Sequence, residues 1–126
     1  VPNWCMNRVA VSGSEEDMKK LKEHVSSEES EFDFDKIIPM PKDINRRPSY
    51  RRYDWSRENW GTKWNSSDVS VESMSDTDAV YTFLTAWSPP EPIILKLREL
   101  YPDINVSAFF DEPDPSHYIT KTGREG

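Results

Sequence analysis

The sequence predicts an α+β fold in which two helices cover one face of a four-stranded antiparallel sheet. Three observations lead to this prediction. In four short runs, apolar residues alternate with polar ones, as they do in half-buried strands. In two other runs, apolar residues recur every three or four positions, as on one face of a helix. A long stretch, residues 31–66, has neither period and separates the first predicted helix from the second predicted strand.

The first strand and the first helix are expected near the N-terminus. Residues 3–12 alternate in character, and Gly13 ends the run. One face of this strand carries Cys5, Asn7, Val9 and Val11. We expect the helix over about residues 14–28, because the hydroxyl of Ser14 can accept a hydrogen bond from the first turn and the acids that follow suit the positive end of the helix dipole.

Residues 31–66 are expected to form a long insert. Pro39 and Pro41 favour extended backbone and block a helix, and residues 46–57 show no clear period. We therefore expect an irregular excursion with one short helical turn near residues 54–59. It is the only stretch long enough to cover the second face of the sheet.

Two further strands are expected after the insert. Val69 and Val71 mark a short one, and residues 79–87 mark a longer one. The polar residues 73–78 are expected to connect them as a hairpin.

The last helix and the last strand follow a proline-rich start signal. Residues 88–91, Ser-Pro-Pro-Glu, have the pattern of a capping box with proline at the first helical position, so Ser88 is expected to cap the helix. Pro102 should end this helix, and residues 104–110 alternate as a final strand.

The predicted order is strand, helix, insert, strand, strand, helix, strand. This order is the split βαβ arrangement of the ferredoxin-like fold. At 126 residues the chain is expected to form a single domain over 1–126. We assign residues 3–110 to the core with its insert and 111–126 to a tail, of which residues 121–126 are expected to be irregular.

The composition narrows the classes of function. The net charge is -7, which argues against a dedicated binder of nucleic-acid backbone. Cys5 is the only cysteine, so no intramolecular disulfide is expected, which fits a reducing cytoplasm. No apolar run is long enough to span a bilayer, so no membrane association is expected. The expected location is cytoplasmic, and the oligomeric state is left open.

Basic residues gather in the insert. Between Lys42 and Lys63 the chain has seven basic and three acidic residues, a net charge of +4, whereas the rest of the chain has a net charge of -11. The sequence therefore places a basic, aromatic segment inside an acidic protein.

Four motifs carry a resemblance to a known family. They are PNWCMN at residues 2–7, FDFDKIIPMP at 32–41, NWGTKWN at 59–65 and TAWSPP at 85–90. Together they resemble the Api92-like proteins, also described as the YubB ferredoxin-like domain. The resemblance implies a ferredoxin-like fold and an origin on a phage or another mobile element of a bacterial host, and it implies no catalytic residues. It also implies a glycine-rich final strand that is not recognisable here, which suggests a shortened C-terminus.

The tryptophans of these motifs have two interpretations. In the structural one, Trp4, Trp60, Trp64 and Trp87 hold the insert against the sheet, and Gly61 supplies a turn that a side chain would block. In the binding one, a cleft stacks a base or holds an anion. Its predicted ligand-binding residues are Arg51, Arg52, Arg57, Trp60, Lys63 and Trp64. Lys63 suits either a phosphate or a cation–π contact.

Enzymatic chemistry has little support in the sequence. His24 and His117 are the only histidines, and with one cysteine they give the wrong ligand count for zinc. His24 is expected to be a half-buried structural residue. The acidic groups at 33/35 and 111–114 lack calcium-loop spacing. We therefore predict no catalytic residue, no metal and no cofactor.

The aromatic strand residues Tyr81 and Phe83 invite comparison with RNA-recognition motifs, which stack bases on sheet aromatics. The signature of those motifs is missing here, and aromatic residues on a strand are more often part of the core.

Two hypotheses of function follow. The first is a non-enzymatic binding module whose Arg/Trp-rich insert contacts an anionic or aromatic ligand, with nucleic acid as one candidate. The alternative is an acidic interaction protein that inhibits or redirects a host protein, for example a defence component. A small metal-dependent enzyme ranks third.

Overall fold

The computed structural model describes residues 3–111 and 121–122, and it shows a five-stranded sheet in the order β2-β3-β1-β4-β5. Each strand pairs antiparallel with its neighbours. The strands are β1 (Trp4–Ser12), β2 (Ser67–Met74), β3 (Asp78–Ala86), β4 (Asn105–Asp111) and β5 (Lys121–Thr122). The first four confirm the predicted four-stranded ferredoxin-like sheet.

The strand β5 was not predicted, since residues 121–126 were expected to be irregular. Its two residues pair with Phe109 and Phe110 at the edge of β4. Two residues are too few to show an alternating pattern, so no periodicity marks this strand.

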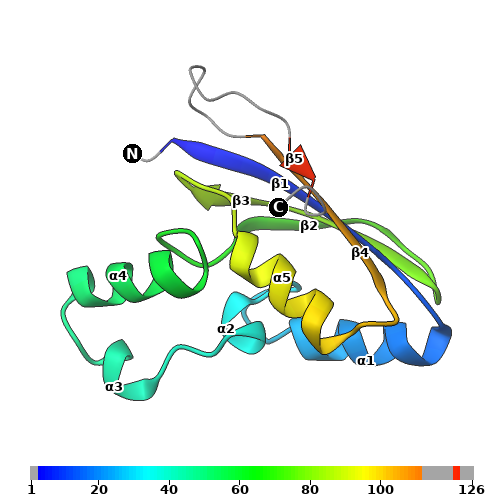
Figure 1. The fold of residues 1–126 in the computed structure, drawn as a ribbon, viewed down its shortest axis with the longest axis horizontal. Coiled ribbons are helices and arrows are strands. Elements are labelled where there is room, and N and C mark those ends of the chain that lie inside the picture. The colour runs from blue at the N-terminus through cyan, green and yellow to red at the C-terminus, as the bar shows by residue number, and fades with distance from the viewer. Residues whose placement is uncertain (1–2, 112–120, 123–126) are drawn as a thin grey trace.

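Two helices, α1 (Glu15–Val25) and α5 (Glu91–Leu100), lie on the same face of the sheet (Figure 1). The start of α1 follows the predicted capping, because the Oγ atom of Ser14 accepts a hydrogen bond from the Asp17 amide at 3.1 Å. Alternate strand residues point into this layer, and Val9 lies opposite both Tyr81 and Ala108. All three are buried.

Two phenylalanines of the insert complete the core. The ring of Phe32 lies 5.1 Å from the ring of Tyr81 and 5.0 Å from that of Phe83, measured between centroids. Phe34 packs edge-on against Phe83 at 5.7 Å. Tyr81 and Phe83 are only 1% and 2% exposed, so they face the helices and cannot stack bases.

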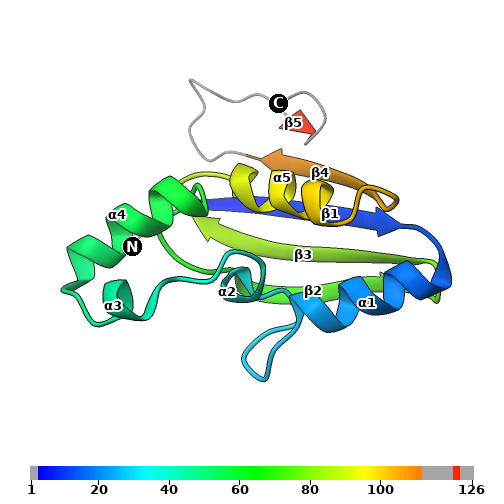
Figure 2. The same cartoon turned by 60° about the horizontal axis from the view of Figure 1, so that its bottom comes forward.

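The insert is more helical than predicted. It contains α2 (Phe34–Ile37), α3 (Lys42–Asn45) and α4 (Ser49–Asn59). The prediction of a single short turn near 54–59 was wrong, because α4 buries only Ser56 fully and therefore has no apolar period to read. These helices extend the helical layer beyond one end of the sheet (Figure 2). They lie on the same side of the sheet as α1 and α5 and do not cover its second face (Figure 1).

The two ends of the insert are joined to each other at a point we call the insert base, residues 32–34 and 65–66. The side-chain amide of Asn65 donates to the Asp33 carboxylate at 2.8 Å and accepts from the Phe34 amide at 3.0 Å. The hydroxyl of Ser66 donates to the Phe32 carbonyl. The insert is therefore a loop closed by hydrogen bonds where it leaves the core.

The second face of the sheet carries Met6 and Phe109, which are 61% and 43% exposed. On the same face Arg8 of β1 forms an ion pair with Glu72 of β2. Within residues 3–111 and 121–122, no helix combines the length and the apolar character that crossing a membrane demands.

Candidate binding site

The turn that follows β3 holds Trp87 in a rare backbone conformation. Its φ angle is +74°, a region that bulky residues seldom adopt. Such a conformation costs about 1–3 kcal/mol and persists only where the surroundings enforce it. Here the Trp87 amide donates to the Asn3 carbonyl at 2.8 Å, and the Ser88 amide donates to the Ala86 carbonyl at 2.9 Å.

Beneath this turn, a buried polar network fixes its geometry. Asn7 donates to the hydroxyl of Thr85 at 3.0 Å, and that hydroxyl donates to the Ser88 carbonyl at 2.7 Å. The hydroxyl of Thr62 donates to the Ala86 carbonyl at 2.7 Å. Asn7, Thr62 and Thr85 are almost fully buried, and among the described residues no buried side-chain nitrogen or oxygen lacks a partner. A fully satisfied network of this kind makes the turn rigid.

Ser88 belongs to this network and does not cap α5, so the capping prediction was wrong. Its hydroxyl donates to the Gly61 carbonyl at 2.6 Å. The residue before the first turn of α5 is Pro90, which makes no side-chain capping bond. The hydroxyl that could have capped the helix instead ties the β3–α5 turn to the end of the insert.

Gly61 allows the end of the insert to approach this turn closely. Its φ angle is +83°. A Cβ atom at this position would lie 2.6 Å from Cδ of Pro92 and 3.1 Å from the carbonyl oxygen of Pro89. Both the backbone angle and the lack of space therefore require glycine here.

The prediction that all four tryptophans hold the insert against the sheet was wrong for Trp87. Its side chain is 52% exposed. The hydrogen bonds around Trp87 involve its backbone, which leaves the indole at the surface.

Trp60 was predicted to contact a ligand, but the structure buries it in the core at 5% exposure. Its ring lies 5.8 Å from that of Phe34 and 5.3 Å from that of Trp55. Its Nε1 donates to the Ile38 carbonyl at 2.8 Å. Trp60 therefore anchors the insert, and only a small part of its surface reaches the hollow at the insert base.

Lys63 lies between two aromatic rings. Its Nζ is 4.6 Å from the centroid of Tyr53 and 5.0 Å from that of Trp64. Trp64 in turn packs against Trp4 at 6.1 Å and against Tyr53 at 6.2 Å. Cation–π contacts of this kind hold an ammonium in place without neutralising its charge.

A surface hollow of about 430 Å3 opens beside Trp87. It is lined by Arg57, Lys63, Ala86, Trp87 and Ser88. Arg57 contacts Asp54 at 2.7 Å, and both side chains are more than half exposed. An exposed pair of this kind contributes little, so an anionic ligand can replace Asp54 as the partner of Arg57. The hollow thus combines an exposed indole with two cations.

Arg51 and Arg52, which were predicted to share this site, are not among the residues that line the hollow. Arg52 is half-buried, and its Nη1 donates to the Arg47 carbonyl at 2.7 Å. Arg51 is exposed but lies about 120° around α4 from Arg57. The sequence placed these arginines together only because they are close along the chain.

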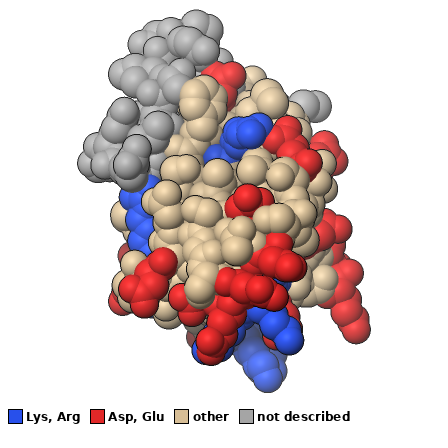
Figure 3. Space-filling model, turned by 90° about the vertical axis from the view of Figure 1, so that its right-hand side faces the viewer, with Lys and Arg blue, Asp and Glu red and all other residues tan. Residues whose placement is uncertain are grey.

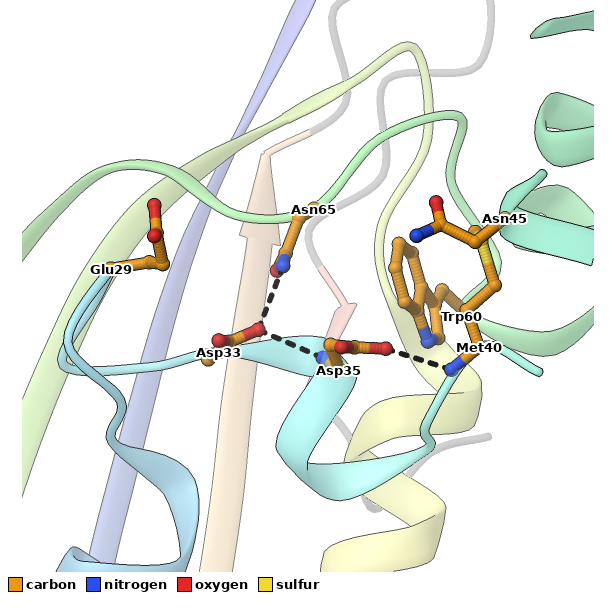
Figure 4. Close-up of a pocket in the computed structure, with 7 residues that line it drawn as sticks. All are labelled: Glu29, Asp33, Asp35, Met40, Asn45, Trp60 and Asn65. Atoms are coloured by element: carbon orange, nitrogen blue, oxygen red, sulfur yellow. Dashed lines mark hydrogen bonds between the residues drawn. The ribbon is translucent and has the colours of Figure 1, made fainter. Parts of the chain in front are cut away.

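A second hollow, of about 310 Å3, lies at the insert base (Figure 4). Two carboxylates that line it, those of Asp33 and Asp35, accept hydrogen bonds from nearby backbone amides. Asp33 is 6% exposed and accepts hydrogen bonds from Asn65, from the Asp35 amide and from Ser27. Asp35 accepts from the Met40 amide at 2.7 Å. Across residues 3–111 and 121–122, no group of three or more potential ligating side chains could hold a metal ion.

The two histidines add no site. His24 is half-buried and hydrogen bonds to the Tyr101 hydroxyl and, at 3.0 Å, to the Lys36 carbonyl. Burial raises the pKa of Tyr101 above its ordinary value. His117 and the acidic residues Glu112 and Asp114 lie outside the described residues.

Residues 59–125 match the family described as the ferredoxin-like domain in Api92-like protein. The chain belongs to this family. The match confirms the resemblance, and two of the four motifs that carry it, at 59–65 and 85–90, lie within the matched region. The Api92-like match therefore includes the Gly61 turn, Lys63 and Trp87. Comparison with curated proteins and with solved structures gave no match.

Proposed function

We propose that this Api92-like protein is a non-enzymatic binding module whose insert contacts an anionic or aromatic ligand, with nucleic acid as the leading candidate. The observation that most supports this proposal is that two basic residues, Arg57 and Lys63, line the same hollow as the exposed indole of Trp87. A guanidinium can bind a phosphate through two parallel hydrogen bonds, and an ammonium held between rings adds a second positive charge.

The distribution of charge over the molecule supports an oriented approach to a polyanion. Residues 42–63 of the insert have a net charge of +4, while the opposite end, seen in Figure 3, shows more acidic than basic side chains. A charge separation of this kind turns the basic end towards an anionic partner during encounter. The net charge of -7 opposes tight binding, so we expect an affinity that is modest and sensitive to salt.

The polar groups of the hollow also favour binding over catalysis. The hydroxyl of Ser88 donates to the Gly61 carbonyl and has no general base beside it among the residues that line the hollow. Acid–base chemistry requires a pair of titratable groups within hydrogen-bond reach of a substrate.

Binding can be tested with labelled single-stranded RNA and DNA by fluorescence anisotropy at two salt concentrations. Two phosphate contacts predict an affinity that falls about sevenfold between 50 and 200 mM salt. The double change Arg57→Glu and Lys63→Glu should reduce the affinity by at least about tenfold. Lys20→Glu on α1, whose side chain is 65% exposed, is the control for a charge change elsewhere. No binding at low salt, or an equal loss in the control, would contradict the proposal.

A second candidate is an acidic interaction protein that inhibits or redirects a host factor. The acidic end shown in Figure 3 favours it. That end includes the start of α1 and the β2–β3 connection, where Glu15, Glu16, Asp76 and Asp78 are exposed. Such a surface can occupy the basic groove of another protein. A partner that is recovered from host lysate after nuclease treatment, and that binds the Arg57/Lys63 double variant equally well, would favour this candidate.

A further inference from the structure

We propose that Trp87 is the residue on which a base of single-stranded nucleic acid stacks, with the neighbouring phosphates on Arg57 and Lys63. This inference rests on the proposed function and names its ligand class. It also assigns a ligand contact to a residue whose expected role was structural.

The fold presents this indole at the surface, outside the hydrophobic core cluster. The side chain is 52% exposed, whereas Trp60 is 5% exposed. The positive φ angle of Trp87 is enforced by backbone hydrogen bonds and by the buried network of Thr62, Thr85 and Ser88. A glycine would adopt this conformation without strain. Because a bulky aromatic residue occupies a backbone conformation that suits glycine, we infer that the ring itself is functional.

The hollow combines the two kinds of residue that binding of a single strand requires, an aromatic ring and basic side chains. Stacking on an aromatic ring together with a positive groove along the backbone is how proteins bind single strands without strong sequence preference. Trp87 supplies the ring, and Arg57 and Lys63 line the same hollow. Its volume of about 430 Å3 lies within the usual range for small-ligand sites, roughly 300–1,000 Å3, and so suits a single nucleotide unit.

An exposed ring that stacks on a base favours single strands over duplexes. Inside a duplex both faces of a base are stacked, so a base must leave the helix before it can stack on a side chain. The strand aromatics Tyr81 and Phe83, which provide the stacking surface in RNA-recognition motifs, are buried here. Phe109, on the second face of the sheet, is the exposed aromatic residue that offers the best comparison.

The test uses three labelled probes in anisotropy titrations: a single-stranded oligonucleotide, its abasic counterpart with the same phosphates, and a duplex of the same sequence. A free mononucleotide serves as competitor. Wild type should prefer the single strand to the abasic and duplex probes. A mononucleotide that displaces the labelled strand as effectively as an unlabelled single strand does, at equal nucleotide concentration, would overturn the assignment to a polymer.

The decisive variant is Trp87→Gly. It should weaken binding of the single strand by about 5- to 150-fold, the range expected for the loss of one base–aromatic stack. Glycine relieves the strain of the positive φ angle but adds entropy to the unfolded chain, and since these two effects oppose each other, the urea midpoint of this variant should stay close to that of wild type. Trp87→Phe keeps a ring and should retain most of the affinity, and Phe109→Ala should leave it unchanged.

The outcomes distinguish this inference from the proposed function. If Trp87→Gly binds like wild type while the Arg57/Lys63 double variant does not, stacking is wrong and the phosphate site stands. If Trp87→Gly is clearly less stable than wild type and Trp87→Phe restores stability without binding, the residue is structural. If wild type binds none of the probes at low salt, both proposals fail.

Discussion

Replacing Gly61 by alanine tests the close approach between the insert and the β3–α5 turn. An alanine at φ +83° costs roughly 1–2 kcal/mol for the left-handed backbone. Its Cβ atom would lie 2.6 Å from Cδ of Pro92, an atom of a rigid ring, and overpacking of this kind costs roughly 1–3 kcal/mol. The expected loss in the free energy of unfolding is therefore about 2–5 kcal/mol.

Gly13→Ala is the matched control. Its Cβ atom would lie 3.1 Å from Cγ1 of Ile104, so that side chain has to move by only a few tenths of an ångström, and no positive φ angle is involved. We expect this change to cost less than about 1 kcal/mol.

Urea unfolding followed by far-UV circular dichroism measures both variants. With a slope of roughly 1.5 kcal/mol per molar for a protein of this size, Gly61→Ala should lower the midpoint by about 1–3 M. The slope should remain that of wild type. The reasoning is refuted if the midpoint of Gly61→Ala lies within about 0.3 M of that of Gly13→Ala, because neither the backbone angle nor the contact with Pro92 would then matter.

Two further predictions concern stability. Asn65→Ala removes a hydrogen-bond donor from the carboxylate of Asp33, which is 6% exposed. The expected loss in the free energy of unfolding, measured with urea, is about 1–3 kcal/mol. The control Asn105→Ala, at an exposed site, should cost less than about 0.5 kcal/mol. Burial raises the pKa of Tyr81 from 10.0 to about 12, so the folded state keeps its proton between these values while the unfolded state loses it. Stability is therefore lost as pH rises through this interval, by up to about 2.7 kcal/mol relative to Tyr81→Phe. A difference between wild type and Tyr81→Phe that stays constant from pH 9.5 to 12 would contradict this prediction.

The sheet and the two main helices could be predicted from the sequence because each buries one face. Val9 and Val11 occupy alternate positions of β1, and Met18, Leu21 and Val25 recur at helical spacing in α1. All five side chains are buried as expected. Local periodicity therefore located these elements without any knowledge of their partners.

The helix α4 and the candidate site could not be predicted in the same way. The helix buries little, so its sequence has no apolar stripe. The hollow depends on contacts between distant residues, such as the hydrogen bond from Ser88 to Gly61, and on the positive φ angle of Trp87. The sequence grouped Arg57 and Lys63, which line this hollow, with Arg51 and Arg52, which do not, and only the tertiary structure separates the two pairs.

The closed base of the insert also bears on how such a protein can diverge. Because Asn65 and Ser66 fasten one end directly to the other, the closure of the insert does not depend on the exposed residues of its outer part. Doubling the length of a flexible loop adds only about 0.6 kcal/mol to the free-energy cost of closing it. The outer residues 42–51, nearly all of them exposed, can therefore be exchanged, shortened or extended while the rest of the structure stays unchanged.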